Sequence, residues 1–489
     1  MFRKTACLLL SALMITSLIA CSSDNASDDN SPADTTAADT VDTAKSDDAA
    51  ETEYPAPELD GVTFDGASFN VMISNPENTR SYSPEETGDS FMDAMYHRDI
   101  DIAEELEIEF VYKIVQEAKD VFNAVNQSVL AGDDTYDLVN NHIMIGVPEM
   151  LTAGCLTDIA VLPNVDLDAP WWNKSIMDTL TVKGKLMYAA NDYVIPQAVG
   201  MVLNRDMVED MKLEDPYKIV NDGLWTIDKM TELAVSVAAD LNGDGVFNTG
   251  DRFGISAHLC WRWASFLYAG GLHVAEIDND GIARITLNND RMFSLIEKLD
   301  ALVYGTNAAH KPKNFNNGND LNIAAEVRRS FMEGNTLLLP ETIGFAMNQY
   351  RDTEVNYGII PLPKLNEGDE YVTNSWEGLV CVPITVDTPD MTGAVLEMLA
   401  YKTRTDVFPV YYTELMGEKI ARDTESKEML DMIFDSITYD FGLSLIGYNN
   451  FSYSVAKMLR EGTTDFASYY AANESEVQAK IDAVYDSVK

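Results

Sequence analysis

The spacing of apolar and polar residues predicts alternating strands and helices in the first part of the folded chain. Residues 68–73 form a predicted strand that stops at a turn-forming segment, 74–78. Residues 94–106 have apolar positions at helical spacing, 108–112 form a second predicted strand, 121–130 a helix and 136–140 a third strand. This order predicts right-handed crossovers and a mostly parallel sheet with helices on both faces.

A second set of strand and helix signals begins after residue 192. The predicted strands are 200–204 and 253–256, and the predicted helices include one that Thr226 caps and one at 291–303. Residues 331–339 are expected to contain a helix end, a turn and a strand. These patterns favour two α/β lobes with a shared cleft, although spacing alone does not show that the chain passes back and forth between them.

The segment 240–251 has the ligand rhythm of a twelve-residue calcium loop. Oxygen-bearing side chains stand at positions 1, 3, 5, 9 and 12, a glycine stands at position 6, and position 7 offers its backbone carbonyl. Two departures weaken the match, because position 12 is Asp and not Glu, and the following residues are a predicted strand and not a helix. We expect a structural Ca²⁺ site with an affinity of about 0.1–1 mM. The predicted ligands are Asp240, Asn242, Asp244, Val246, Asn248 and Asp251.

The N-terminal residues carry the pattern of an export signal. Two cations precede a short apolar run, and Ala20 stands just before Cys21. This pattern resembles a bacterial lipoprotein signal, which implies that residues 1–20 are removed and that Cys21 becomes the lipidated N-terminus. Residues 21–57 would then form an acidic, disordered linker, because they contain few apolar side chains. The expected location is extracytoplasmic, with the chain anchored to the cell membrane by lipid alone.

Charge, cysteine content and the absence of hydrolase motifs limit the classes of function that the protein can have. The chain has 80 acidic and 34 basic side chains, for a formal net charge of −46, which argues against nucleic acid as a partner. Cys155, Cys260 and Cys381 remain after the N-terminal pair is set aside, so we expect at most one disulfide and favour free thiols. No hydrolase motif appears, and no two carboxylates stand out as a glycosidase pair.

Several motifs in order along residues 60–489 together resemble extracellular solute-binding proteins of bacterial ABC importers, and most closely the carbohydrate-binding family often called family 1. The motifs are Trp-Thr-Ile-Asp-Lys-Met at 225–230, the loop leading into Arg-Phe-Gly-Ile at 252–255, the segment 263–271, Phe-Met-Glu-Gly-Asn-Thr at 331–336, Tyr-Gly-Ile-Ile-Pro-Leu-Pro at 357–363, Ala-Arg-Asp at 421–423 and Pro-Trp-Trp-Asn at 170–173. The resemblance implies a two-lobed, type II periplasmic-binding-protein-like α/β fold. Lobe 1 would contain residues 58–191 and 376–425, and lobe 2 residues 192–375 and 426–489.

The resemblance also implies a monomer that closes on a small-molecule solute and presents it to the transmembrane subunits of an ABC permease. By position in the family pattern, the ligand would meet strand ends and crossings of both lobes. The implied ligand-binding residues are Asn75, Glu77, Asn141, His142, Asp192, Tyr193, His258, Trp261, Arg262, Trp263, Glu341, Trp376 and Glu377.

The types of these residues suit a sugar. A pyranose offers an apolar face for an aromatic ring and hydroxyl groups for carboxylate, amide or guanidinium groups, and Trp376 and Trp261 each have a charged neighbour in the sequence. Two alternatives stay open. The cargo could be a peptide or another polar solute, including a cation, or the protein could be a surface-anchored glycoside hydrolase.

Overall fold

The computed structural model describes residues 54–74, 81–278, 281–350, 353–376, 378–417, 424–447 and 450–488. Residues 54–489 form one compact unit, which is described here by itself. The predicted signal segment 1–20, Cys21 and most of the predicted linker lie outside the described residues. No helix of the described residues is long and apolar enough to cross a membrane.

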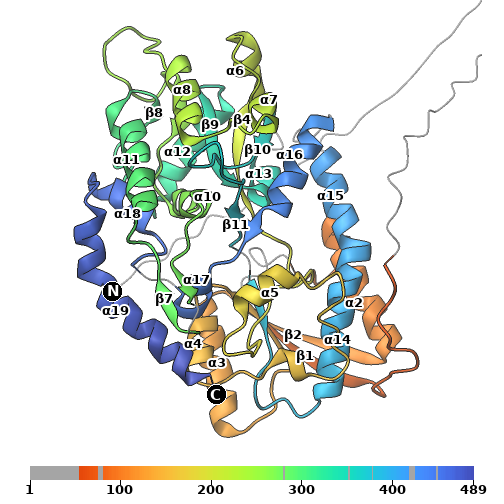
Figure 1. Cartoon of the computed structure of the whole chain (residues 1–489). Coiled ribbons are helices and arrows are strands. Elements are labelled where there is room, and N and C mark those ends of the chain that lie inside the picture. Colours follow the sequence, from red (N-terminus) through yellow and green to blue (C-terminus); the bar gives the residue numbers. More distant parts are fainter. Residues whose placement is uncertain are drawn as a thin grey trace, which may run out of the picture. The chain divides into compact units, whose positions relative to one another are not determined.

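The first sheet is mainly parallel, as its pattern predicts. Its strand order is β12-β3-β1-β2, in which β1 runs parallel to β2 and β3 and the last strand to join, β12, is antiparallel to β3. Helices α2 and α3 lie against it, and α14 packs on α2 (Figure 1). The elements of this region are β1 (Ala67–Ser74), α2 (Ser90–Leu106), β2 (Ile108–Val115), α3 (Ala118–Ala131), β3 (Leu138–His142), α4 (Val147–Thr152), η1 (Ile159–Val161), α5 (Lys174–Leu180), β12 (Gly378–Cys381), α14 (Pro389–Lys402), the π-helical turn η2 (Thr403–Val407) and α15 (Phe408–Gly417).

The second sheet is mixed, which corrects the expectation that both sheets are mainly parallel. Its order is β10-β4-β9-β5-β8, and β4 is antiparallel to both of its neighbours. The chain enters β4 from the sheet end where β9 finishes, because Val199 pairs with Thr342, so β4 must run in the opposite direction. Its elements are β4 (Val199–Asn204), α6 (Arg205–Asp210), α7 (Pro216–Asn221), α8 (Ile227–Val237), β5 (Phe253–Ser256), α9 (Trp261–Ala264), α10 (Phe266–Ala269), β6 (Ala275–Ile277), β7 (Ala283–Ile285), α11 (Asp290–Gly305), β8 (Ala309–His310), α12 (Leu321–Met332), β9 (Thr336–Thr342), α13 (Ile343–Gln349), β10 (Tyr357–Ile360) and β11 (Thr373–Asn374).

The predicted helix after Thr226 shows how local sequence positions these elements. Thr226 is the N-cap of α8, and its hydroxyl accepts a hydrogen bond from the backbone N–H of Lys229. The apolar face of α8 packs against β5 so closely that a β-carbon at Gly254 would lie 2.2 Å from backbone atoms of Ala234. Glycine at 254 therefore allows the helix and the strand to approach each other.

The C-terminal segment contacts both parts of the unit. Helix α16 lies against β10, α17 contacts α4 and α5, α18 contacts α11, and α19 contacts α4 as well as α11 (Figure 1). The predicted allocation of residues to two lobes therefore stays a prediction. The elements of this segment are α16 (Thr424–Asp435), β13 (Ile437–Thr438), α17 (Phe441–Ile446), α18 (Ser454–Glu461) and α19 (Phe466–Ser487).

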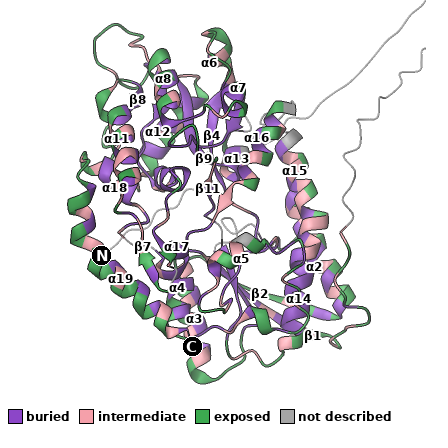
Figure 2. Cartoon of the chain, in the orientation of Figure 1, coloured by how far each residue is buried: buried purple, intermediate pink, exposed green. Residues whose placement is uncertain are grey.

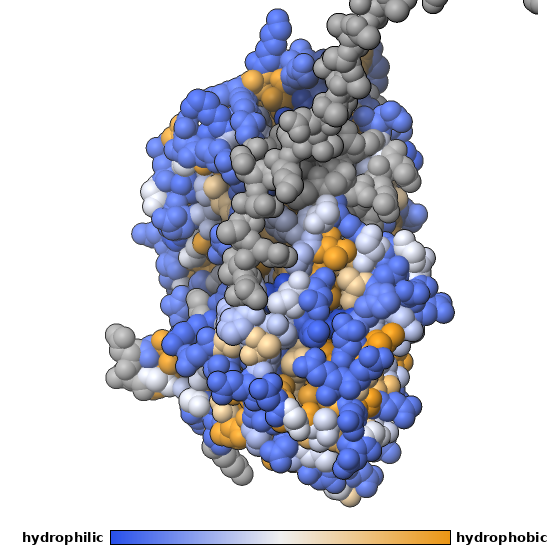
Figure 3. Space-filling model, turned by 90° about the vertical axis from the view of Figure 1, so that its right-hand side faces the viewer, coloured by the Kyte–Doolittle hydropathy of each residue, from blue (hydrophilic) through white to orange (hydrophobic). Residues whose placement is uncertain are grey.

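Burial follows the predicted pattern of the strands. The central strands are buried, whereas the outward faces of helices such as α19 are exposed (Figure 2). The three cysteines 155, 260 and 381 are buried free thiols, as favoured from the sequence. The face in Figure 3 is mostly hydrophilic with scattered apolar side chains, in keeping with the large excess of acidic residues.

Candidate functional site

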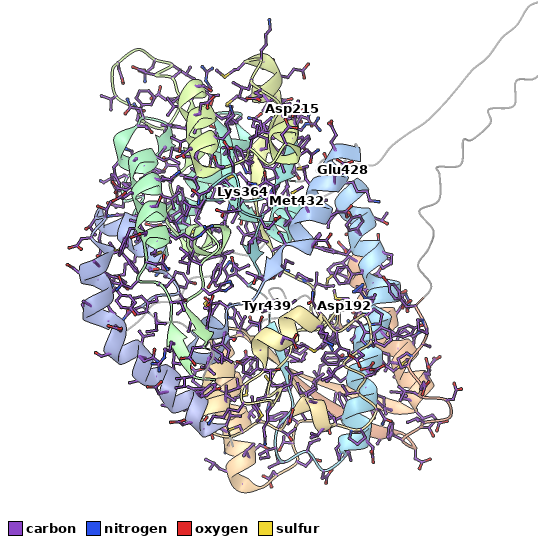
Figure 4. All side chains as sticks on the ribbon, viewed as in Figure 1. Asp192, Asp215, Lys364, Glu428, Met432 and Tyr439 are labelled. Atoms are coloured by element: carbon purple, nitrogen blue, oxygen red, sulfur yellow. The ribbon has the colours of Figure 1, made fainter. Side chains whose placement is uncertain are left out.

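Three segments of the chain run beside one another between the two sheets. Residues 192–198 lead into β4, residues 375 and 376 follow β11 on the way to β12, and β13 leads from α16 to α17. Ala198 forms an antiparallel bridge with Ser375, whose hydroxyl accepts a hydrogen bond from the backbone N–H of Gln197 at 2.7 Å. Strand β11 pairs in parallel with β13. Asp192 and Tyr439, near two of these crossings, lie at the middle of the unit in Figure 4.

Trp376 is the centre of an aromatic cluster at the returning crossing. Its ring centroid lies 5.8 Å from that of Trp261, 6.4 Å from that of Tyr268 and 6.2 Å from that of Tyr453. Its indole N–H donates a hydrogen bond to the Ser265 hydroxyl at 3.2 Å. Trp376 is 7% exposed, while Trp261 and Tyr453 are half-buried. The cluster therefore has apolar ring surface that a sugar could contact, chiefly on Trp261 and Tyr453.

Arg262 and Glu341 form a buried ion pair at the end of the second sheet. The Nε of Arg262 donates to Oε1 of Glu341, and the Nε of Arg328 lies 3.6 Å from Oε2 of the same carboxylate. The guanidinium of Arg262 also lies over the ring of Trp261, 4.4 Å from its centroid. The structure thus joins three residues that the sequence predicted for the site, namely Trp261, Arg262 and Glu341.

The two predicted histidines are neutral near pH 7. Burial lowers the pKa of His142 to about 4. Burial also lowers the pKa of His258 to about 4. The hydrogen bond to the Asn317 carbonyl raises that pKa, whereas the positive charge of Arg262 lowers it further. The Nε2 of His258 lies 3.3 Å from the Asn317 carbonyl oxygen, and the Nδ1 of His142 accepts from the backbone N–H of Met144. Each imidazole therefore serves as a neutral polar group.

Asp192, at the start of the first crossing, pairs with Arg404. Burial raises the pKa of Asp192 to about 7, although the guanidinium of Arg404 opposes that shift. Arg404 also donates to the backbone carbonyl of Pro170 at 2.8 Å. Tyr193 is fully buried, and its ring faces the guanidinium of Arg98, 5.0 Å from the centroid. These contacts attach the first crossing to the η2 turn and to α2.

Several amides at the crossings are buried without hydrogen-bond partners. Neither polar atom of the Asn191 side chain, nor of the Asn374 side chain, has a partner among the described residues. The Asn141 amide N–H group donates to the carbonyls of Ala118 and Ile145, which leaves its oxygen unpaired within that same set. Buried amides of this kind require partners, which a polar ligand or bound water can supply.

Some predicted residues are placed elsewhere or are not described. Trp263 is 1% exposed and packs on Phe266 in the core, so its ring is not free for a sugar to stack on. Trp171 and Trp172 are also buried, and both indole N–H groups donate to Glu397. Asn75, Glu77 and Glu377 lie outside the described residues, as does the motif 421–423.

The predicted calcium loop folds around its own acidic side chains. The two oxygens of Asp240 accept from the backbone N–H groups of Gly243 and Gly245, and those of Asp251 accept from Leu241 and Asn248. The backbone hydrogen bonds lower the pKa of Asp251, beginning with that from Asn248. No group of three His, Cys, Asp or Glu side chains that could hold a metal ion lies in the described part of the chain. A cation in this loop would be bound by both carboxylate and side-chain amide oxygens.

Four residues of this region were missed from the sequence: Ser265, Tyr268, Tyr453 and Arg328. Arg328 could have been found, because Ala324, Val327 and Phe331 mark the buried face of α12 and Arg328 shares that face by helical spacing. The other three depend on contacts between segments far apart in the chain, which no local pattern indicates.

No protein-family model and no curated protein sequence matches the chain. Solved structures do match. Mycobacterium tuberculosis UspC aligns with a TM-score of 0.58 at 14% identity, over 84% of this chain and 100% of that one. A maltose-binding periplasmic protein from Listeria monocytogenes, in complex with maltose, aligns with a TM-score of 0.53 at 14% identity, over 87% and 98% of the two chains.

A third similar structure is a cyclic alpha-maltosyl-1,6-maltose binding protein from Arthrobacter globiformis, with a TM-score of 0.54 at 14% identity, over 86% of this chain and 98% of that one. Each similar chain is matched over nearly its whole length, so the likeness extends across both sheets and the crossings between them. The chain thus has the two-lobed, periplasmic-binding-protein-like α/β fold that its sequence pattern implied.

Proposed function

We propose that this protein is the substrate-binding component of an ABC importer and that it captures an extracellular sugar or oligosaccharide. The observation that carries the proposal is the aromatic cluster around Trp376, which lies where three crossings join two α/β sheets. An aromatic surface, together with buried amides that have no partner among the described residues, matches the two chemical faces of a sugar. The shared fold with structures named for maltose and a cyclic maltosyl-maltose supports this class of cargo.

The mechanism that we propose is closure about the crossings. A solute would first contact one sheet's strand ends, and rotation about the three crossings would bring the other sheet onto it. Short pairings such as β11 with β13, two residues each, can adjust their backbone angles without disturbing either sheet. The closed form would be the one that a membrane permease recognises. On this proposal the protein binds its solute without chemical change.

Two further parts of the proposal concern membrane attachment and calcium binding. We propose that Cys21 carries lipid and that residues 22–57 give the folded unit its reach from the membrane. We also propose that the loop 240–251 holds a structural Ca²⁺. Its side-chain ligands would be Asp240, Asn242, Asp244, Asn248 and Asp251, and Val246 would add its backbone carbonyl. Bound there, the ion would stiffen the connection between α8 and β5.

The test uses the chain from Cys21 onward, screened by calorimetry against oligosaccharides and peptides with calcium present. We expect micromolar or tighter binding of at least one saccharide without turnover, and a smaller radius of gyration by X-ray scattering when that saccharide is saturating. Binding of peptides alone, or cleavage of a glycan, would contradict the proposed cargo or class. Equal radii for empty and saturated protein would contradict closure.

A further inference from the structure

The crossing end of the second sheet carries two arginines against one carboxylate. Arg262 and Arg328 both pair with Glu341, and they line a pocket that also contains His258 and Ser256. Each guanidinium is charged at every physiological pH. His258 is neutral near pH 7, since burial lowers its pKa to about 4. The described side chains of this pocket therefore carry one positive charge in excess.

Among the described residues, the two guanidinium groups have more N–H donors than they have acceptors. Arg262 uses Nε for Glu341 and Nη1 for the Cys260 sulfur at 3.5 Å. Among the described residues, Glu341 is the acidic partner of Arg328, and the two side chains are 3.6 Å apart. A guanidinium has five N–H donors, so several remain available to an outside acceptor. A partly buried charge without a full partner is costly, and an incoming anion would remove that cost.

The pocket faces the crossings. Glu341 pairs with Gly200, one residue into β4 from the first crossing, so the pair of arginines lies at the end of the sheet where the chain passes to the other lobe. Arg262 links the pocket to the aromatic cluster, because its guanidinium lies over the ring of Trp261, which in turn contacts Trp376. A sugar that contacts Trp261 would therefore lie beside the guanidinium of Arg262.

Size limits how an anion would sit. The pocket has about 10 Å³ of accessible volume, roughly that of one water molecule, so it does not enclose a sugar ring. The Arg328 side chain is 21% exposed, whereas that of Arg262 is 10% exposed. A small anionic group can thus meet Arg328 at the mouth of the pocket while its sugar ring remains on the aromatic side. Phe345 holds the Arg328 guanidinium in place, 4.3 Å from the ring centroid.

We propose that the captured saccharide carries an anionic group, a carboxylate or a sulfate ester, which binds to Arg328 and Arg262. This assignment rests on the proposed capture of a sugar and specifies its chemical class. The large negative net charge of the chain does not prevent such binding, because salt screens distant charges beyond about 8 Å and leaves the two adjacent arginines dominant. The arginines select by their planar donor groups, which match a carboxylate or sulfate in a way that hydroxyl groups do not.

The experiment compares matched saccharide pairs by calorimetry on the chain from Cys21 onward. Each pair consists of a uronic acid oligosaccharide and its methyl ester, which removes the charge and keeps the shape, or of a sulfated sugar and its unsulfated parent. We expect the charged member to bind tighter, with an affinity that falls as salt rises. Tighter binding of the uronates identifies a carboxylate as the anion, and tighter binding of the sulfated sugars identifies a sulfate ester.

The variant Arg328→Gln tests the residue. Because Arg328 is half-buried and its pairing with Glu341 is long, we expect this variant to fold and to lose about 10- to 100-fold in affinity for the charged member alone. The matched control is Arg329→Gln, since Arg329 is exposed on the same helix and pairs with Glu333. The control should bind as the wild type does.

The outcomes separate the two proposals. If the neutral member of each bound pair binds as tightly as the charged one, or if R328Q does not weaken the charged member, the anion assignment is wrong while sugar capture stands. If no saccharide of either kind binds, sugar capture is wrong and the anion assignment fails with it.

Discussion

The indole N–H of Trp376 donates a hydrogen bond to the hydroxyl of Ser265, 111 residues earlier in the chain, at 3.2 Å. This bond ties the returning crossing to the short helices that follow β5. It also sets the tilt of the Trp376 ring against Trp261 and Tyr453, and so it fixes the geometry of the aromatic cluster on which sugar capture would depend.

Replacement of Trp376 should weaken saccharide binding. We expect Trp376→Ala to lower affinity by about 10-fold or more, because it removes the ring that supports Trp261 and Tyr453. Trp376→Phe keeps an aromatic ring without the hydrogen bond to Ser265 and should lose less. Calorimetry on both variants measures the difference. Wild-type affinity in the alanine variant would remove Trp376 from the site.

Calcium removal should lower thermal stability. For an affinity of about 0.1–1 mM, 1 mM Ca²⁺ adds about 0.4–1.4 kcal/mol to the unfolding free energy. A chelator should therefore lower the Tm by about 0.5–1.5 °C, and Asp240→Asn should reduce that response. Asp133→Asn, which changes an exposed carboxylate away from the loop, is the control. An identical Tm with calcium and with chelator would contradict the calcium proposal.

Glu397 should make stability depend on pH. Burial raises the pKa of Glu397 from 4.5 to about 7, even though the indole N–H groups of Trp172 and Trp171 oppose that shift. Between these two pH values the folded state binds more protons than the unfolded state, so stability falls as pH rises from about 4.5 through 7. The effect is of order 1–3 kcal/mol.

Thermal unfolding at pH 5, 6, 7 and 8 measures this effect. Glu397→Gln cannot ionise and should give a shallower fall of Tm with pH, although it loses one indole hydrogen bond. Burial also raises the pKa of Asp192 to about 7, so the E397Q variant should keep the part of the pH dependence of Tm that Asp192 causes. Glu104→Gln, on an exposed position of α2, should retain the wild-type slope. A slope as steep in E397Q as in the wild type would rule out Glu397 as its source.

Gly254 should tolerate no side chain. A β-carbon there would lie 2.2 Å from backbone atoms of Ala234, so Gly254→Ala must push α8 away from β5 and should cost at least about 2 kcal/mol of unfolding free energy. The control is Gly305→Ala at the end of α11, where the nearest atom lies 4.0 Å away. Chemical denaturation should show a change within about 0.5 kcal/mol for the control. Equal stability of the two variants would contradict the close packing.

The predicted elements agree well with the structure where the pattern is local. The strand 253–256, the helix capped by Thr226 and the helix 291–303 correspond to β5, α8 and α11. The direction of β4 was not predicted, because a strand's apolar pattern is the same in either direction. The site residues also divide into those that the sequence indicated and those that only packing placed. Trp261 and Arg262 were chosen for residue type and family position, whereas the placement of Trp263 in the core depends on its packing against Phe266.

The sequence by itself determined the alternation of strands and helices and the Thr226 cap, since these depend on residues within a few positions of one another. It also determined the strong acidity of the chain and the residue types available to a sugar. Only the tertiary structure decided that β13 forms a third crossing and that Arg328 shares Glu341 with Arg262. Thr373 of β11 pairs with Ile437 of β13, 64 positions later, and Glu341 lies 79 positions after Arg262 and 13 after Arg328. Such contacts arise when sheet pairing and helix packing bring distant segments together.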